Sequence, residues 1–97
     1  MMKDMILRDG NRLIVSGAVT IENVVKLTEL GSAMLNQEDW VIDMQQVTEV
    51  DSSAVSMLLE WQRRAHRQNG QIQFANLPEA LKSLAQLYGV SELIPMG

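Results

Sequence analysis

The sequence predicts an α/β domain in which a mixed sheet of about four strands packs with three helices, in the order β-β-α-β-α-β-α. The chain has 97 residues, of which 46% are hydrophobic, and this suits one modest core. Short runs rich in β-branched residues alternate with longer apolar patterns of helical period, and Gly, Asn and Pro mark the boundaries. Strands joined by helices pair in parallel through right-handed crossovers. We therefore expect residues 1–97 to form a single domain.

The first two expected strands form a hairpin. Residues 5–8 and 12–15 are apolar runs, and the intervening Asp9-Gly10-Asn11 is typical of a tight β-turn. Gly17 is expected to end the second strand. Thr20 then precedes a pattern that predicts an amphipathic helix, and its apolar residues are expected to form one stripe: Ile21, Val24, Val25, Leu27, Leu30, Met34 and Leu35.

The middle of the chain predicts two further parallel strands around a second helix. Residues 40–44 are short, apolar and β-rich, which favours a buried strand. The second helix is expected from about Ser52 to Gln68, where Asn69-Gly70 stops it. Residues 71–75 alternate between polar and apolar side chains, which predicts the fourth strand.

The last expected helix runs from Pro78 to Tyr88. Proline is favoured in the first turn of a helix, and Gly89 is a typical residue just after its end. The face of this helix that is expected to point inward contains Leu81, Leu84, Ala85 and Tyr88. After the helix, the tail is expected to pack on the sheet through Leu93 and Ile94.

Composition excludes several classes of function. The net charge is -4, and the only local concentration of basic residues is Arg63, Arg64 and Arg67, so we expect no nucleic-acid partner. The chain contains no cysteine, which excludes disulfides, thiol catalysis and cysteine zinc sites. Residues 1–5 lack the apolar region of a signal peptide, and no apolar run approaches the roughly 18 residues that span a bilayer. We expect a cytoplasmic protein that does not insert directly into a membrane.

The most informative segment is Val50-Asp51-Ser52-Ser53-Ala54-Val55, where a strand region gives way to a helix. Asp or Ser at this place commonly caps the helix through a side-chain oxygen, and a helix N-terminus favours anions. Capping alone explains these residues. A second interpretation uses the same geometry, since an exposed hydroxyl can donate to a partner or accept a phosphate, which Asp51 would oppose by its charge.

A helical wheel divides the second helix into two faces. The expected core face contains Ala54, Val55, Leu58, Gln62 and Ala65, with Leu59 at its margin. The opposite flank contains Ser53, Met57, Glu60 and Arg64, with Trp61 on the border. Met and Trp beside Arg are enriched at protein interfaces, but Met57 and Trp61 also suit an extension of the core, and both interpretations stay open.

The residue pattern does not indicate catalysis. A nucleophilic serine needs a base within hydrogen-bond reach, and the only histidine, His66, lies roughly 20 Å along the helix from Ser52. Asp43 and Asp51 could approach each other at strand ends, although loop and cap hydrogen bonding is the more ordinary role for both. There is no cluster of metal ligands, and the glycines are scattered rather than grouped in a phosphate loop. We expect a protein that is not an enzyme and holds no cofactor or metal.

Several of these segments together resemble the signature of STAS domains. The resemblance lies in residues 41–44, Val47, residues 50–55 and the apolar helix that follows, and it extends to residues 76–81 and 88–90. Two positions depart from the family pattern: Ala54 stands where members usually have Gly, and residues 17–20 keep only the glycine of a common Gly-Glu-Leu-Asp. The resemblance implies a STAS-like fold for residues 1–97.

The resemblance also implies two functional branches. The favoured one is the small STAS subunit of the Mla-type ABC transporter, which moves phospholipid between the membranes of Gram-negative bacteria and maintains outer-membrane lipid asymmetry. Such a subunit binds the cytoplasmic ATPase subunit, in a complex with a membrane permease, and is peripherally associated with the inner membrane. The stand-alone size and residues 84–90 favour this branch. The alternative is an anti-sigma-factor antagonist in which a partner kinase phosphorylates Ser52.

The site residues expected for the favoured branch surround the start of the second helix. Ser52 would make the central polar contact with the partner, and Asp51 and Asp43 would hold the loop and cap. The remaining partner-binding residues would be Ser53, Met57, Trp61 and Arg64.

Overall fold

The computed structural model describes residues 6–94. Its elements are β1 (Ile6–Asp9), β2 (Arg12–Val19), α1 (Val24–Met34), β3 (Asp39–Val50), α2 (Ser53–Arg67), β4 (Gln71–Ala75), α3 (Glu79–Leu87) and the short 3-10 helix η1 (Ser91–Leu93). This order confirms the expected fold class. Met5, the expected first residue of the hairpin, lies outside the described residues.

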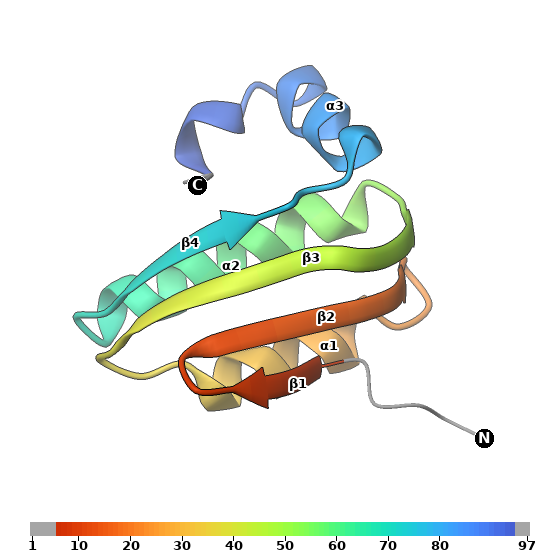
Figure 1. Ribbon diagram of the computed structural model, residues 1–97. Coiled ribbons are helices and arrows are strands. Elements are labelled where there is room, and N and C mark those ends of the chain that lie inside the picture. Colours follow the sequence, from red (N-terminus) through yellow and green to blue (C-terminus); the bar gives the residue numbers. More distant parts are fainter. Residues whose placement is uncertain (1–5, 95–97) are drawn as a thin grey trace.

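The four strands form one sheet in the order β1-β2-β3-β4. β1 pairs with β2 in antiparallel fashion, and β2, β3 and β4 run parallel to one another. Helices α1 and α2 make the two crossovers and cover the same face of the sheet, whereas α3 lies beyond the end of β4 (Figure 1). α2 therefore has the sheet, α1 and α3 as its neighbours. Its first residue, Ser53, follows shortly after Val50, the last residue of β3.

The core lies between the sheet and the two crossover helices. Alternation along the strands directs one set of side chains toward the helices. Leu13, Ile42 and Phe74 belong to this set, lie opposite one another in the register of three neighbouring strands, and are fully buried or nearly so. Large buried side chains from the helices complete the core, among them Leu58 and Leu81.

Two strands are longer than expected. Gly17 does not end β2, because the strand continues to Val19. Gly17 has φ +84 and lies where the β2–β3 register shifts, so it makes a bulge in the strand. β3 likewise continues past residue 44 to Val50, since its polar second half pairs with residues 16–19 of β2. Backbone pairing, rather than side-chain hydrophobicity, keeps residues 45–49 in the strand.

The expected single apolar stripe of α1 is wrong. The buried face of α1 contains Val24 and Leu27, whereas Ile21 is 71% exposed, Val25 67% and Leu30 40%. The helix begins only at Val24, so Ile21 lies in the preceding loop. Val25 and Leu30 lie on opposite sides of the buried face, about 100° and 120° from Val24 around the axis.

The C-terminal segment agrees with expectation in part. Leu81, Ala85 and Ile94 are buried, and Gly89, at φ +71, follows the end of α3. Tyr88 and Leu93 were expected to face inward but are 54% and 56% exposed. Tyr88 directly follows α3, at the turn that leads to η1. These two side chains therefore belong to the surface.

The contact between α1 and α2 depends on Gly31 and Trp61. The Trp61 side chain is 0% exposed, and its Nε1–H donates to the carbonyl oxygen of Thr28 at 3.0 Å. A Cβ atom at Gly31 would overlap the indole ring. The glycine thus lets α1 approach α2 closely enough for the tryptophan to fill the space between them.

We expect Gly31→Ala to lower the free energy of unfolding by about 1–2 kcal/mol, because overpacking against Trp61 outweighs the better helix propensity of alanine. Urea unfolding followed by far-UV circular dichroism measures the effect. In a Trp61→Leu background, the same substitution should no longer destabilise the protein, since the overlapping ring is gone. An equal loss in both backgrounds would contradict the packing explanation.

Candidate functional site

The candidate site lies where β3 ends and α2 begins, and the Asp51 carboxylate organises it. Oδ1 of Asp51 accepts hydrogen bonds from the Ser53 hydroxyl and from the Ser53 backbone N–H, the latter at 2.9 Å. Oδ2 accepts from the backbone N–H of Ile21 at 2.9 Å. The Ser53 hydroxyl, followed by the Ile21 N–H, lowers the pKa of Asp51 from its ordinary value, despite some opposing desolvation. One carboxylate therefore connects the loop before α1 to the start of α2.

This arrangement gives the two serines different roles. The Ser53 hydroxyl is held by Asp51 and is half-buried. Ser52 is exposed, has helical dihedral angles (φ -63, ψ -21) and makes no side-chain hydrogen bond that caps α2. The first turn is thus capped by the Asp51 side chain, and among the described residues the Ser52 hydroxyl has no hydrogen-bond partner.

Asp43 does not lie near Asp51 and does not lie in a loop, contrary to the sequence expectation. It occupies the middle of β3, eight residues before Asp51, which is roughly 26 Å along a strand. Its carboxylate accepts hydrogen bonds from Arg12 Nη2 at 2.9 Å, from Asn76 Nδ2 at 3.1 Å and from the Gln45 N–H at 3.0 Å. Desolvation by burial would raise the pKa of Asp43, but these donors and the Arg12 charge together lower it.

Met57 and Trp61 belong to the core, so of the two interpretations that the sequence leaves open the extension of the core is confirmed, and the two side chains are not exposed for a partner. Their exposed fractions are 1% and 0%. α2 packs against α1 as well as the sheet, and its buried face is therefore broader than one stripe and rotated toward these residues. Gln62, expected in the core, is only partly buried. Of the flank residues, Arg64 stays at the surface and is half-buried.

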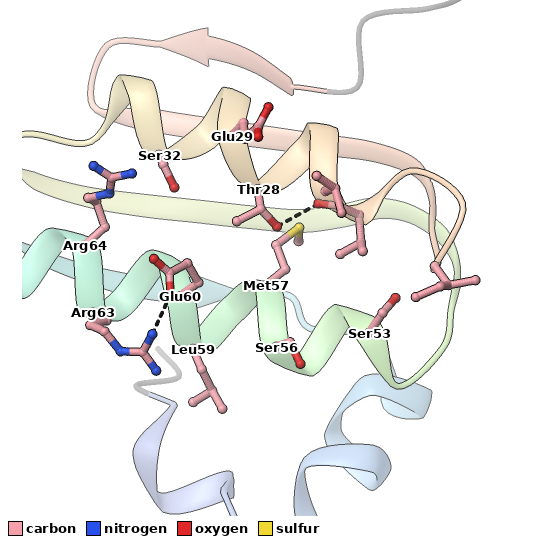
Figure 2. Close-up of a pocket in the computed structure, with 13 residues that line it drawn as sticks. Thr28, Glu29, Ser32, Ser53, Ser56, Met57, Leu59, Glu60, Arg63 and Arg64 are labelled. Carbon is pink, nitrogen blue, oxygen red and sulfur yellow. Dashed lines mark hydrogen bonds and ion pairs between the residues drawn. The ribbon is translucent and has the colours of Figure 1, made fainter.

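A groove of about 660 Å³ runs between α1 and α2, and we call it the α1–α2 groove (Figure 2). Ile21 and Val25 lie at its rim with most of their surface exposed. Its lining is contributed from the α1 side by Ile21, Val24, Val25, Thr28, Glu29 and Ser32, and from α2 by Ser53, Ser56, Met57, Leu59, Glu60, Arg63 and Arg64. The sequence pattern had assigned Ile21 and Val25 to the core, so this rim was not expected.

A second hollow of about 270 Å³ lies on the α3 side of α2. We call it the α2–α3 surface, and its lining is Ser52, Val55, Ser56, Leu59, Tyr88 and Val90. The exposed side chains of Leu87 and Leu93 lie in the flanking segments. Sequence reasoning missed Ser56 and Tyr88. A signal for Ser56 was present, since it follows Ser52 by four residues and so shares its face of the helix.

The described residues offer little for catalysis or metal binding at this site. His66 is exposed near the other end of α2, about 21 Å from Ser52 by helical rise. Within residues 6–94, no group of three or more His, Asp or Glu side chains could hold a metal ion. In the same span, no helix is both long and apolar enough to cross a bilayer. The site therefore contains the Ser52 hydroxyl, which has no hydrogen-bond partner among the described residues. It lies in the α2–α3 surface, and the α1–α2 groove begins on the other side of the α2 start.

A mixed sheet of this order, with an Asp-Ser-Ser turn between the third strand and the second crossover helix, has the architecture of a STAS domain. Residues 5–95 match the family model described as "Mlab, STAS domain". The chain belongs to the STAS domain family.

Solved structures show the same fold. The anti-sigma factor antagonist SpoIIAA in its unphosphorylated form superimposes with a TM-score of 0.72 at 14% sequence identity, over 95% of this chain and 85% of that one. An anti-sigma-factor antagonist (STAS) domain protein from Planctomyces limnophilus gives a TM-score of 0.71 at 13% identity, over 94% and 86% of the two chains. A comparison with curated proteins finds no match. At these identities the likeness establishes the fold alone.

We expect Asp43→Asn to lower the free energy of unfolding by about 2 kcal/mol at pH 7, because the amide would leave Arg12 without its carboxylate. The pKa of Asp43 is lowered in the folded state, so its stabilisation is full above about pH 4, the unfolded value, and is lost as the pH falls further. The difference between wild type and variant should therefore shrink toward pH 3. Urea unfolding at both pH values tests this, with exposed Asp39→Asn as the control. A difference that stays constant with pH would exclude an ionised Asp43 as the cause.

Proposed function

We propose that this chain is a non-enzymatic accessory subunit that binds the cytoplasmic ATPase of an ABC transporter, of the Mla type that moves phospholipid between membranes. The description of the matching family model, "Mlab, STAS domain", supports this branch. In this role the chain would be held at the inner membrane through the ATPase and its permease. The energy for transport would come from ATP hydrolysed by the partner.

The observation that carries the proposal is the exposed hydroxyl of Ser52. Asp51 caps α2 and holds Ser53, so the Ser52 hydroxyl is free to bond to a partner group. Apolar side chains with large exposed fractions lie on both sides of it, Ile21 toward α1 and Tyr88 toward α3. A polar contact surrounded by apolar surface that excludes water is the usual arrangement of a binding hot spot.

Binding of the subunit at this place would change the populations of the conformations of its partner. A ligand favours one conformation of a protein only when it binds that conformation more tightly than the others. The Asp51 carboxylate accepts hydrogen bonds from the backbone N–H groups of Ile21 and Ser53, and these bonds fix the start of α2. This part of the surface is therefore rigid rather than adaptable. A rigid subunit of this kind suits the stabilisation of one assembled state of the ATPase.

We expect Ser52→Arg to weaken binding to the proposed ABC ATPase partner at least about tenfold, because the arginine would place a bulky charge at the centre of the contact. Co-purification and biolayer interferometry with the purified ATPase measure the effect. Gln68→Arg, which adds the same charge at the exposed far end of α2, is the matched control and should bind as wild type does. Undiminished binding of Ser52→Arg would argue strongly against docking at this site.

The second candidate function is an anti-sigma-factor antagonist regulated by phosphorylation of Ser52. The exposure of Ser52 in the first turn of α2 favours it, because a helix start partly stabilises a phosphate charge. The ionised Asp51 next to it opposes that charge.

Incubation with ATP and an anti-sigma kinase encoded nearby, followed by mass spectrometry, separates the two functions. Our proposal predicts no phosphate on Ser52, with a known antagonist as the positive control for the kinase. A phosphate that is absent from Ser52→Ala would favour the second candidate instead.

A further inference from the structure

The α1–α2 groove has an apolar rim that the packing of the chain itself does not use. Ile21 is 71% exposed and Val25 67%, whereas Val24 and Met57 beneath them are buried at 8% and 1%. A groove with a dry apolar floor and exposed apolar rim suits the apolar face of a helix from another protein. Figure 2 shows that α1 and α2 lie side by side, and the residues that line the groove come from both helices along their length.

Arg64, at one end of the groove, also lacks an acidic partner among the described residues. Glu60 forms ion pairs with Arg63 and, at 3.6 Å, with Arg67. Arg64 forms no ion pair with a described residue, and its Nε is buried without a hydrogen-bond partner. Ser32 lies at the same end of the groove, across from Arg64 (Figure 2). The half-buried guanidinium of Arg64 therefore has no carboxylate partner among the described residues, and a carboxylate is the group whose geometry suits a guanidinium best.

We infer that the α1–α2 groove binds an amphipathic helix of the ATPase partner, with apolar residues against Ile21 and Val25 and an Asp or Glu carboxylate against Arg64. The inference rests on the proposed function, because the helix belongs to the same partner. It adds a second contact, on the opposite side of α2 from Tyr88. Val25 and Ser32 are seven residues apart on α1, about 10 Å along its axis, so the acidic residue lies about two turns from the residue that meets Val25.

Site-specific cross-linking tests this inference on the assembled complex. The chain contains no cysteine, so Val25→Cys provides a single thiol for a photo-activated cross-linker. In the complex with the proposed ABC ATPase partner, the expected product joins the introduced thiol at position 25 to an ATPase helix of the stated pattern, identified by mass spectrometry. Gln68→Cys, at the far end of α2, is the control and should not label that helix.

The outcomes separate the inference from the proposed function. A complex that forms normally but gives no cross-link from position 25 overturns the groove assignment and leaves the proposed function standing. A cross-link to a second copy of this chain also overturns it. Failure of the complex to form at all, with Ser52 intact, overturns both.

We expect Arg64→Met to weaken ATPase binding at least about tenfold and to reduce the salt dependence of that binding. In the free chain the same substitution removes a buried nitrogen without a partner, so the melting temperature should stay unchanged or rise. Arg64→Lys should retain the salt dependence, and Arg63→Met, which removes a charge already paired with Glu60, should bind as wild type does. A lower melting temperature for Arg64→Met would assign the residue a structural role, and an equal effect of Arg63→Met would indicate a general charge effect. Either result overturns the inference.

Discussion

The arrangement of the candidate site depends on the Asp51 carboxylate. It accepts hydrogen bonds from the loop before α1, through Ile21, and from the start of α2, through Ser53, although Ile21 and Asp51 are 30 residues apart in the sequence. Ile21 begins the rim of the α1–α2 groove, and Ser52 belongs to the α2–α3 surface on the other side of the α2 start. A single acidic side chain thus fixes the relative positions of the groove rim and the exposed hydroxyl.

The Gly31–Trp61 contact fixes the positions of α1 and α2 relative to each other at a second point, farther along the two helices. Asp51 fixes the relation of α1 and α2 at their N-terminal ends, and the indole of Trp61, bonded to the Thr28 carbonyl, fixes it farther along. Two fixed points hold the helices at a constant separation, so the α1–α2 groove is present before any partner arrives. A preformed site loses less conformational entropy on binding than one that must be ordered by its ligand.

Sequence reasoning predicted the element order and the Asp-Ser-Ser turn, because both depend on local signals. The hairpin follows from Asp9-Gly10-Asn11, and the end of α3 follows from Gly89. The errors concern contacts between elements. The sequence left Met57 and Trp61 open between core and interface because a helical wheel assumes one buried face, and it does not show that α1 covers a second face of α2. Ile21 and Val25 were placed in the core for the same reason, since hydrophobicity alone does not distinguish a buried stripe from an exposed one.

The exposed apolar side chains and the partnerless Arg64 nitrogen share a physical explanation. Each one lowers the stability of the free chain relative to a sequence with polar rim residues and a shorter neutral side chain. The core shows that the chain can bury large apolar residues completely, as it does with Trp40, Trp61 and Phe74. Features that cost stability and lie along the exposed flanks of α2 are therefore better explained by binding than by folding. The partner proposed above would therefore contact this helix at its N-terminal turn and along its flanks.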